Sequence, residues 1–305
     1  MVSEDAETTP FGRLLRQRRN QRDVTQERLA YRADLSPRHV SFLETGRSNP
    51  SRSSVLALAR ALDLPLRDRN ALLRAAGFAG AYPERDPLGP GTSRVRSLFS
   101  FLLRSHEPYP AFVADRMWTV RMHNRAATEL VAWLLDESLR DGDEAGEDSP
   151  AGRGAAADRC RDGSPAADRV PGPLEGTNLL RLLFDPEKLR PLTVNFEAVG
   201  RFLWNRLEEE IALGPDDESL VKLREELASY GPLPEGVPDL PAGNGAPALP
   251  VHLRKDGVDL RLLSFLLTVA APREVGIQEI RLETFLPADE ETEKYLREEI
   301  GRAGG

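Results

Sequence analysis

Residues 24–46, VTQERLAYRADLSPRHVSFLETG, determine the fold of the first part of the chain. Thr25 is a helix-capping residue that opens one short helix, and residues 33–35 (Ala-Asp-Leu) form a tight turn after it. Ser36 then caps a second helix, and Pro37 occupies its first position, where a missing N–H has no cost. The stretch therefore predicts two helices joined by a tight turn.

The flanking sequence predicts three further helices. An apolar and basic segment over 11–20 precedes the break at 21–23, and apolar residues recur at helical spacing over 55–62. A last helix, about Leu66–Ala76, ends at the capping residue Gly77. We expect an all-α, five-helix domain over residues 1–80.

The rest of the chain predicts a second domain of mixed α/β type. Residues 81–91 contain PERDPLGPG, which is typical of a linker. Over 92–300 the pattern predicts antiparallel strands and flanking helices. We expect flexible insertions near 136–176 and 231–247, where large apolar residues are scarce.

Charge is distributed unevenly along the chain. The net charge is −8, yet residues 11–78 hold 14 Arg against six Asp and Glu, a net +8, and residues 79–305 carry −13. A basic head joined to an acidic body indicates that only the head binds a polyanion. The chain has one cysteine, Cys160, so an internal disulfide and a cysteine-built zinc site are excluded.

The predicted helix pair suits recognition of double-stranded DNA. The major groove, about 12 Å wide, admits a helix whose N-terminal residues face the base edges. The exposed backbone N–H groups at a helix start, such as the one after Thr25, suit a phosphate group.

The head resembles the Xre/Cro/lambda-repressor family of helix-turn-helix domains over about residues 11–76. The resemblance rests on LLRQRRNQRDVTQERLA, SPRHVSFLETGRSNPS and LALARALDL. It implies a phosphate contact for Gln26, base-facing positions for Ser36, Pro37, Arg38 and Phe42, a phosphate-binding loop at Arg47, Ser48 and Asn49, and a structural ion pair between Arg19 and Glu44.

Two of the base-facing positions depart from the polar residues usual in this family. Pro37 and Phe42 have no hydrogen-bonding side chain, so they can read only a thymine methyl or the groove shape. Arg38 is then the best candidate for a bidentate contact to guanine. A contact from Arg38 to phosphate is the alternative.

The body resembles the PAS-like ligand-binding domain of MmyB-like regulators. The matching stretches are EPYPAFVADRMWTVRMHNRAATELV, TNLLRLLFDPEKLRPLTVNFEAVGRFLWNRLEEE and RLLSFLLTVAAPREVGIQEIRLETFLPADEETEKYL, which together span most of 94–297. The resemblance implies a bound fatty-acyl or similar lipophilic molecule, and no other cofactor or metal is expected. Candidate ligand-binding residues are Phe112, Arg116, Trp118, Asn124, Phe184, Trp204 and Phe285.

Several alternatives remain at this stage. The aromatic residues of the body could fill a dry core instead of lining a cavity, and Asn124 could simply cap a helix. No catalytic or metal-ligating spacing is present, so an enzyme fused to a DNA reader is the weakest alternative.

The sequence predicts a cytoplasmic, homodimeric transcription regulator that binds double-stranded DNA and senses a lipophilic effector. The polar N-terminus and the lack of a long apolar run predict no secretory signal and no membrane span. In the leading alternative function, the body is only a dimerisation or partner-binding module.

Overall fold

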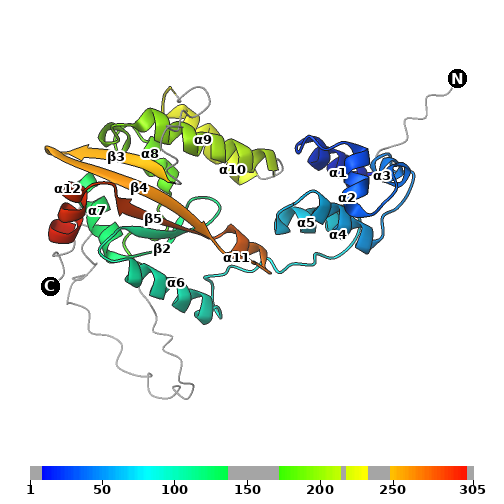
Figure 1. Ribbon diagram of the computed structural model, residues 1–305, viewed down its shortest axis with the longest axis horizontal. Coiled ribbons are helices and arrows are strands. Elements are labelled where there is room, and N and C mark those ends of the chain that lie inside the picture. The colour runs from blue at the N-terminus through cyan, green and yellow to red at the C-terminus, as the bar shows by residue number, and fades with distance from the viewer. Residues whose placement is uncertain (1–8, 137–171, 214–217, 233–247, 301–305) are drawn as a thin grey trace, which may run out of the picture.

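The computed structural model describes residues 9–136, 172–213, 218–232 and 248–300 of the 305-residue chain. It has two parts, which we call the head (residues 10–75) and the body (residues 93–300). Figure 1 shows the head to one side of the body, joined to it by an extended segment.

The head consists of five helices, as the sequence predicts. They are α1 (Pro10–Asn20), α2 (Gln26–Ala33), α3 (Pro37–Glu44), α4 (Arg52–Ala61) and α5 (Leu66–Ala75). Apolar side chains from all five helices form one core, whose members Leu15, Leu29, Leu43, Leu58 and Leu72 are fully buried. Burial of these leucines holds the short helices together, because helices of 8–11 residues are marginal in isolation.

Helix α1 crosses α3 at a point where only glycine fits. A Cβ atom on Gly12 would lie 2.6 Å from the Glu44 carbonyl oxygen and 2.7 Å from that of Leu43. The close approach fixes α1 against the C-terminal end of α3.

The body is built on one five-stranded antiparallel sheet, with strand order β2-β1-β5-β4-β3. The strands are β1 (Ala111–Ala114), β2 (Val120–His123), β3 (Leu249–Lys255), β4 (Val258–Thr268) and β5 (Arg281–Pro287). The helices are α6 (Ser93–His106), α7 (Arg125–Leu135), α8 (Leu179–Phe184), α9 (Phe196–Leu213), α10 (Glu218–Ser229), α11 (Val275–Glu279) and α12 (Glu290–Tyr295), and α12 continues into a π-helical turn, Leu296–Ile300. Together, the two parts confirm the predicted fold, an all-α head followed by a mixed α/β body.

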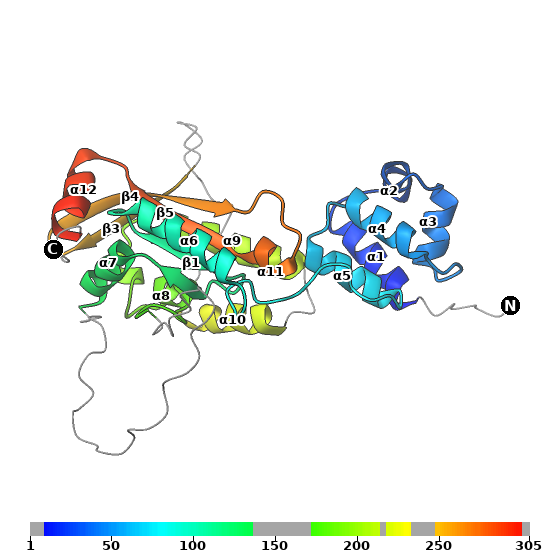
Figure 2. The same cartoon turned by 90° about the horizontal axis from the view of Figure 1, so that it is seen from below.

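The two faces of the sheet carry different helices. On one face, Phe99 and Leu103 of α6 pack against Val113 and Met122 of the sheet. Helices α7, α8, α9 and α10 cover the other face, where they share a core with β3 and β4. Figures 1 and 2 show α6 on the side of the sheet opposite to α9 and α10.

The loop between β3 and β4 is a two-residue hairpin at Asp256 and Gly257. Both residues have positive φ angles, 49° and 80°, and Lys255 pairs directly with Val258. An Asp-Gly pair favours this conformation, which twists in the same sense as the strands. The Asp256-Gly257 pair therefore accounts for the tight turn between the two strands.

The short helix α11, which the sequence did not indicate, touches the head. The Gln278 side chain accepts a hydrogen bond from the Leu66 N–H (2.6 Å) at the start of α5, which lacks a side-chain cap of its own. The Arg67 guanidinium donates two hydrogen bonds to the Glu279 carboxylate, at 2.6 and 2.8 Å. The body thus supplies the cap of the last helix of the head.

The expected insertions fall mostly outside the described residues. Residues 172–176, at the end of the first, are described, and Leu174 is buried against α7 and β1. This end of the segment therefore belongs to the packed body.

Candidate functional sites

The α2–α3 pair is capped as its sequence requires. The Thr25 hydroxyl accepts a hydrogen bond from the Arg28 N–H (3.1 Å), and the Ser36 hydroxyl accepts one from the His39 N–H (3.1 Å). Asp34 ends α2 with a φ of 56°, a left-handed conformation that Asp tolerates better than most residues. The caps fix both helix starts, and the backbone N–H groups there remain oriented toward an approaching anion.

The outer surface of α3 carries an arginine stacked on an aromatic ring. Ser36, Pro37 and Arg38 are exposed, and the Arg38 guanidinium carbon lies 5.1 Å from the centroid of the Phe42 ring. A cation over a ring one turn later along the helix is attracted to the face of that ring, which restricts the positions of the guanidinium. Arg38 can therefore present paired N–H donors outward from the start of this helix.

The inner end of α3 is held by a buried carboxylate. Glu44 is fully buried and accepts hydrogen bonds from Arg19 at 2.7 and 3.0 Å. The Gln26 amide donates to the same carboxylate (2.7 Å), and the half-exposed Arg16 lies 3.5 Å away. Glu44 thereby ties α1, α2 and α3 into one rigid unit.

The body contains an apolar cavity of about 100 Å³ between the sheet and the helices that cover it. A single water needs roughly 10–15 Å³ of such space, so the cavity admits several atoms of a guest molecule. Eighteen residues line it, and all but one are apolar. They are Phe112, Trp118, Leu130, Val131, Leu134, Leu179, Leu180, Leu182, Leu183, Leu189, Val199, Leu203, Leu249, Val251, Leu253, Leu262, Glu283 and Phe285.

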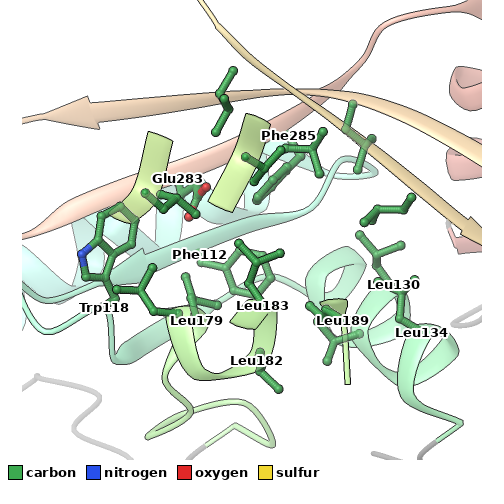
Figure 3. Close-up of a pocket in the computed structure, with 18 residues that line it drawn as sticks. Phe112, Trp118, Leu130, Leu134, Leu179, Leu182, Leu183, Leu189, Glu283 and Phe285 are labelled. Carbon is green, nitrogen blue, oxygen red and sulfur yellow. The ribbon is translucent and has the colours of Figure 1, made fainter. Parts of the chain in front are cut away.

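The exception is Glu283 on β5, whose carboxyl lies among the apolar side chains in Figure 3. Burial raises the pKa of the Glu283 carboxyl above its usual value, and this effect outweighs the Ser264 hydrogen bond and the charges of Arg281 and Arg206. The site therefore favours the protonated form of this acid more than water does.

One wall of the cavity separates it from a polar cleft between head and body. Trp118 lines the cavity, and the Arg281 guanidinium lies 4.6 Å from the centroid of its ring. Arg281 also donates a 2.5 Å hydrogen bond to Glu210 and lines the cleft together with Arg67 and Glu279. A single layer of side chains thus lies between the cavity and the contacts to the head.

Two family models match the chain. A helix-turn-helix domain model matches residues 10–72. The model of the MmyB-like transcription regulator ligand binding domain matches residues 95–149 and 154–298, more than half of the chain. The chain belongs to the family of MmyB-like transcription regulators. A search of curated proteins found no match.

Among solved structures, this MmyB-like regulator is similar to a restriction-modification controller protein from Aeromonas hydrophila. The two are 36% identical over 20% of the regulator and 92% of the controller, with a TM-score of 0.19. An RNA-binding light-oxygen-voltage receptor is 14% identical, over 95% of the regulator and 62% of the receptor, with a TM-score of 0.25.

The regulator presents the expected DNA-contacting residues on one part of the head. Ser36, Pro37 and Arg38 begin α3, and Arg47, Ser48 and Asn49 form the loop after it. The Arg47 and Ser48 N–H groups both donate to the Phe42 carbonyl, at 2.9 and 3.3 Å, so that loop folds back over the end of α3. Ser36 also acts as a helix cap, and the Gln26 amide is bound to Glu44.

Only three of the seven expected ligand residues line the cavity of the regulator: Phe112, Trp118 and Phe285. Asn124 caps α7 by accepting a hydrogen bond from the Ala127 N–H (3.0 Å), so it has the capping role given above as the alternative to ligand binding. Arg116 lies in the polar cleft, 3.8 Å from Glu279.

Phe184 and Trp204 lie in the core around the cavity and do not line it, with ring centroids 6.3 Å apart. They were expected to line a pocket because they are large and aromatic. Instead, they pack in the surrounding core, and leucines of the same helices take the lining positions.

Sequence reasoning missed the one polar lining residue, Glu283. The signal was present, because side chains two positions apart on a strand share a face and Phe285 was a candidate. Within the described part of the chain, no helix is long and apolar enough to cross a membrane, and no group of three metal-ligating side chains is found.

Proposed function

We propose that this regulator is a one-component sensor, in which the head reads specific DNA and the body, a PAS-like domain, binds a lipophilic, fatty-acyl-type molecule. The observation that carries the proposal is the apolar cavity of about 100 Å³ in the same chain as an exposed, basic helix-turn-helix surface. Protein interiors are close-packed, so a cavity of this size supports ligand binding over the alternative of a dry core.

On the DNA side, we propose that Arg38 reads a base and that the loop after α3 grips the backbone. The contact of Arg38 with Phe42 supports base reading, because it holds the guanidinium at the exposed surface of α3. The exposure of Arg47 and Asn49 supports phosphate contacts in the loop. The Gln26 amide keeps its contact with Glu44 unless DNA draws it away.

The ligand side is tested on the purified full chain by mass spectrometry under denaturing conditions. We expect a lipophilic molecule to be released. Val199→Phe, which fills the cavity from α9, should abolish its uptake and change the affinity for operator DNA. Val194→Phe, the same change at a side chain that is 49% exposed, is the control. If no apolar compound binds, and if Val199→Phe behaves like this control, sensing is rejected.

A second proposal concerns assembly into a homodimer, which matches the two half-sites of a typical operator. The supporting observation is an exposed apolar face on α6, formed by Leu98, Phe101 and Leu102, which are 55%, 59% and 36% exposed. Light scattering should give twice the chain mass for the wild type and a lower mass for Phe101→Ser. A wild-type monomer at micromolar concentration would contradict dimerisation.

A further inference from the structure

Glu283 is placed by strand alternation so that it faces the cavity. On β5, Arg281, Glu283 and Phe285 share one side of the strand, and the latter two line the cavity. The remaining 17 lining residues carry no polar side chain apart from the Trp118 indole, whose buried Nε1 has no hydrogen-bond partner among the described residues. The side-chain hydrogen-bonding groups of the lining are therefore the Glu283 carboxyl and the Trp118 indole N–H.

The hydrogen bonding of Glu283 leaves one of its two carboxyl oxygens without a partner among the described residues. The Ser264 hydroxyl donates to Oε1 of Glu283 at 2.8 Å. Over the described residues, this is the one hydrogen bond that the Glu283 side chain makes. A protonated carboxyl has one O–H donor in addition to its accepting oxygen, so the second oxygen can donate to a guest.

Two cations, Arg281 and Arg206, lie near the cavity but outside its lining, and each contacts Glu210. Among the described residues, Arg281 Nη1 is buried without a hydrogen-bond partner. The Arg281 guanidinium binds Glu210 and stacks on Trp118. Arg206 lies 3.5 Å from the same Glu210. None of the 18 lining residues is Lys, Arg or His, so the lining supplies no positive charge to a carboxylate or phosphate head group.

We propose that the cavity takes an uncharged lipophilic molecule whose hydroxyl or carbonyl oxygen accepts a hydrogen bond from Glu283. The proposal rests on the proposed sensing function and narrows it to aliphatic chains with a neutral polar end, such as alcohols, ketones and esters. A buried polar group without a partner is costly, so the guest that satisfies the acid binds more tightly than an alkane of equal length.

Charged guests are disfavoured for two separate reasons. A carboxylate would bring a negative charge into an apolar site whose lining holds an acid and no cation. An alkylamine would require Glu283 to ionise, against the burial that raises its pKa. The neutral guest avoids both costs.

The test compares five probes with similar chains on the delipidated full chain: octane, octanol, methyl hexyl ketone, octanoate and octylamine. Binding is measured by equilibrium dialysis with mass-spectrometric detection. We expect octanol and the ketone to bind roughly three- to tenfold more tightly than octane, the gain of one hydrogen bond. Octanoate and octylamine should bind more weakly than octane.

Two variants assign the preference to Glu283. Glu283→Leu should remove the advantage of octanol over octane, whereas Glu283→Gln keeps an N–H donor and should retain part of it. Glu225→Leu, on the exposed face of α10, is the matched control and should behave like the wild type.

The outcomes separate this inference from the sensing function. Tightest binding of octanoate or octylamine, or an unchanged octanol preference in Glu283→Leu, overturns the neutral-head-group inference and leaves sensing intact. If no probe binds, octane included, the sensing function itself fails.

Discussion

Arg19→Met should strongly lower the stability of the head, because it leaves a buried carboxylate without its main partner. Arg19 donates two hydrogen bonds to the fully buried Glu44 and a third to the Val24 carbonyl, at 2.9 Å. Breaking a buried ion pair by removing one partner costs about 3–5 kcal/mol. Arg16, at 3.5 Å and half exposed, replaces part of the lost charge, so we expect about 3 kcal/mol.

Hydrogen–deuterium exchange on the full chain measures this loss in the head alone. A cost of about 3 kcal/mol corresponds to exchange roughly a hundredfold faster in α1 and α3, with the body unchanged. Arg28→Met, on the exposed surface of α2, is the control and should change exchange by less than about threefold.

A double variant tests the reason for the loss. Arg19→Met with Glu44→Met removes both charges, and an apolar pair of similar volume should restore at least half of the stability. If Arg19→Met matches the control, or if the two substitutions destabilise additively, the buried pair does not hold these helices together.

Three further perturbations follow from the same geometry. Arg38→Ala should relax base preference at one position of each half-site, whereas Arg47→Ala should weaken binding to all DNA sequences equally and lower the salt slope by about one; competition binding at several salt concentrations separates the two. Gly12→Ala should destabilise the head by about 1–3 kcal/mol, because its Cβ would meet the Glu44 carbonyl oxygen, and equal urea midpoints would refute this. The stability contributed by protonated Glu283 is fully present below its ordinary pKa of 4.5 and is lost as pH rises through its raised folded-state pKa. In urea unfolding, the free energy of unfolding of Glu283→Gln should therefore increase relative to that of the wild type as pH rises above 4.5. A difference independent of pH would contradict the raised pKa.

Local chemistry made most of the elements predictable. The capping residues Thr25 and Ser36 mark the starts of α2 and α3, and the Asp256-Gly257 pair marks the β3–β4 turn. The helix expected over about Leu66–Ala76 spans Leu66–Ala75 in the structure. In each case, a few adjacent residues determine the backbone, so no knowledge of distant contacts is needed.

The cavity lining was less predictable, because it depends on how distant elements pack. Phe184 belongs to α8, yet its neighbours Leu182 and Leu183 reach the cavity, and residue type alone does not reveal which side of a short helix faces inward. Helix α11 was missed for a related reason. Its five residues are too few to show a helical period in the sequence. The helix also contacts Leu66 and Arg67 of the head, which lie more than 200 residues away in the sequence.

The run from α11 into β5 connects the cavity to the head through covalent neighbours. Glu279 accepts a hydrogen bond from Arg67 of the head. Within the next four residues of the chain, Arg281 lines the cleft and Glu283 faces the cavity. Coupling between two binding events is reciprocal, so any factor by which a guest alters operator affinity is also the factor by which operator DNA alters affinity for that guest. Operator DNA is then itself an effector of the cavity, and the uptake of a guest measured with and without DNA reports the strength of regulation without a transcription assay.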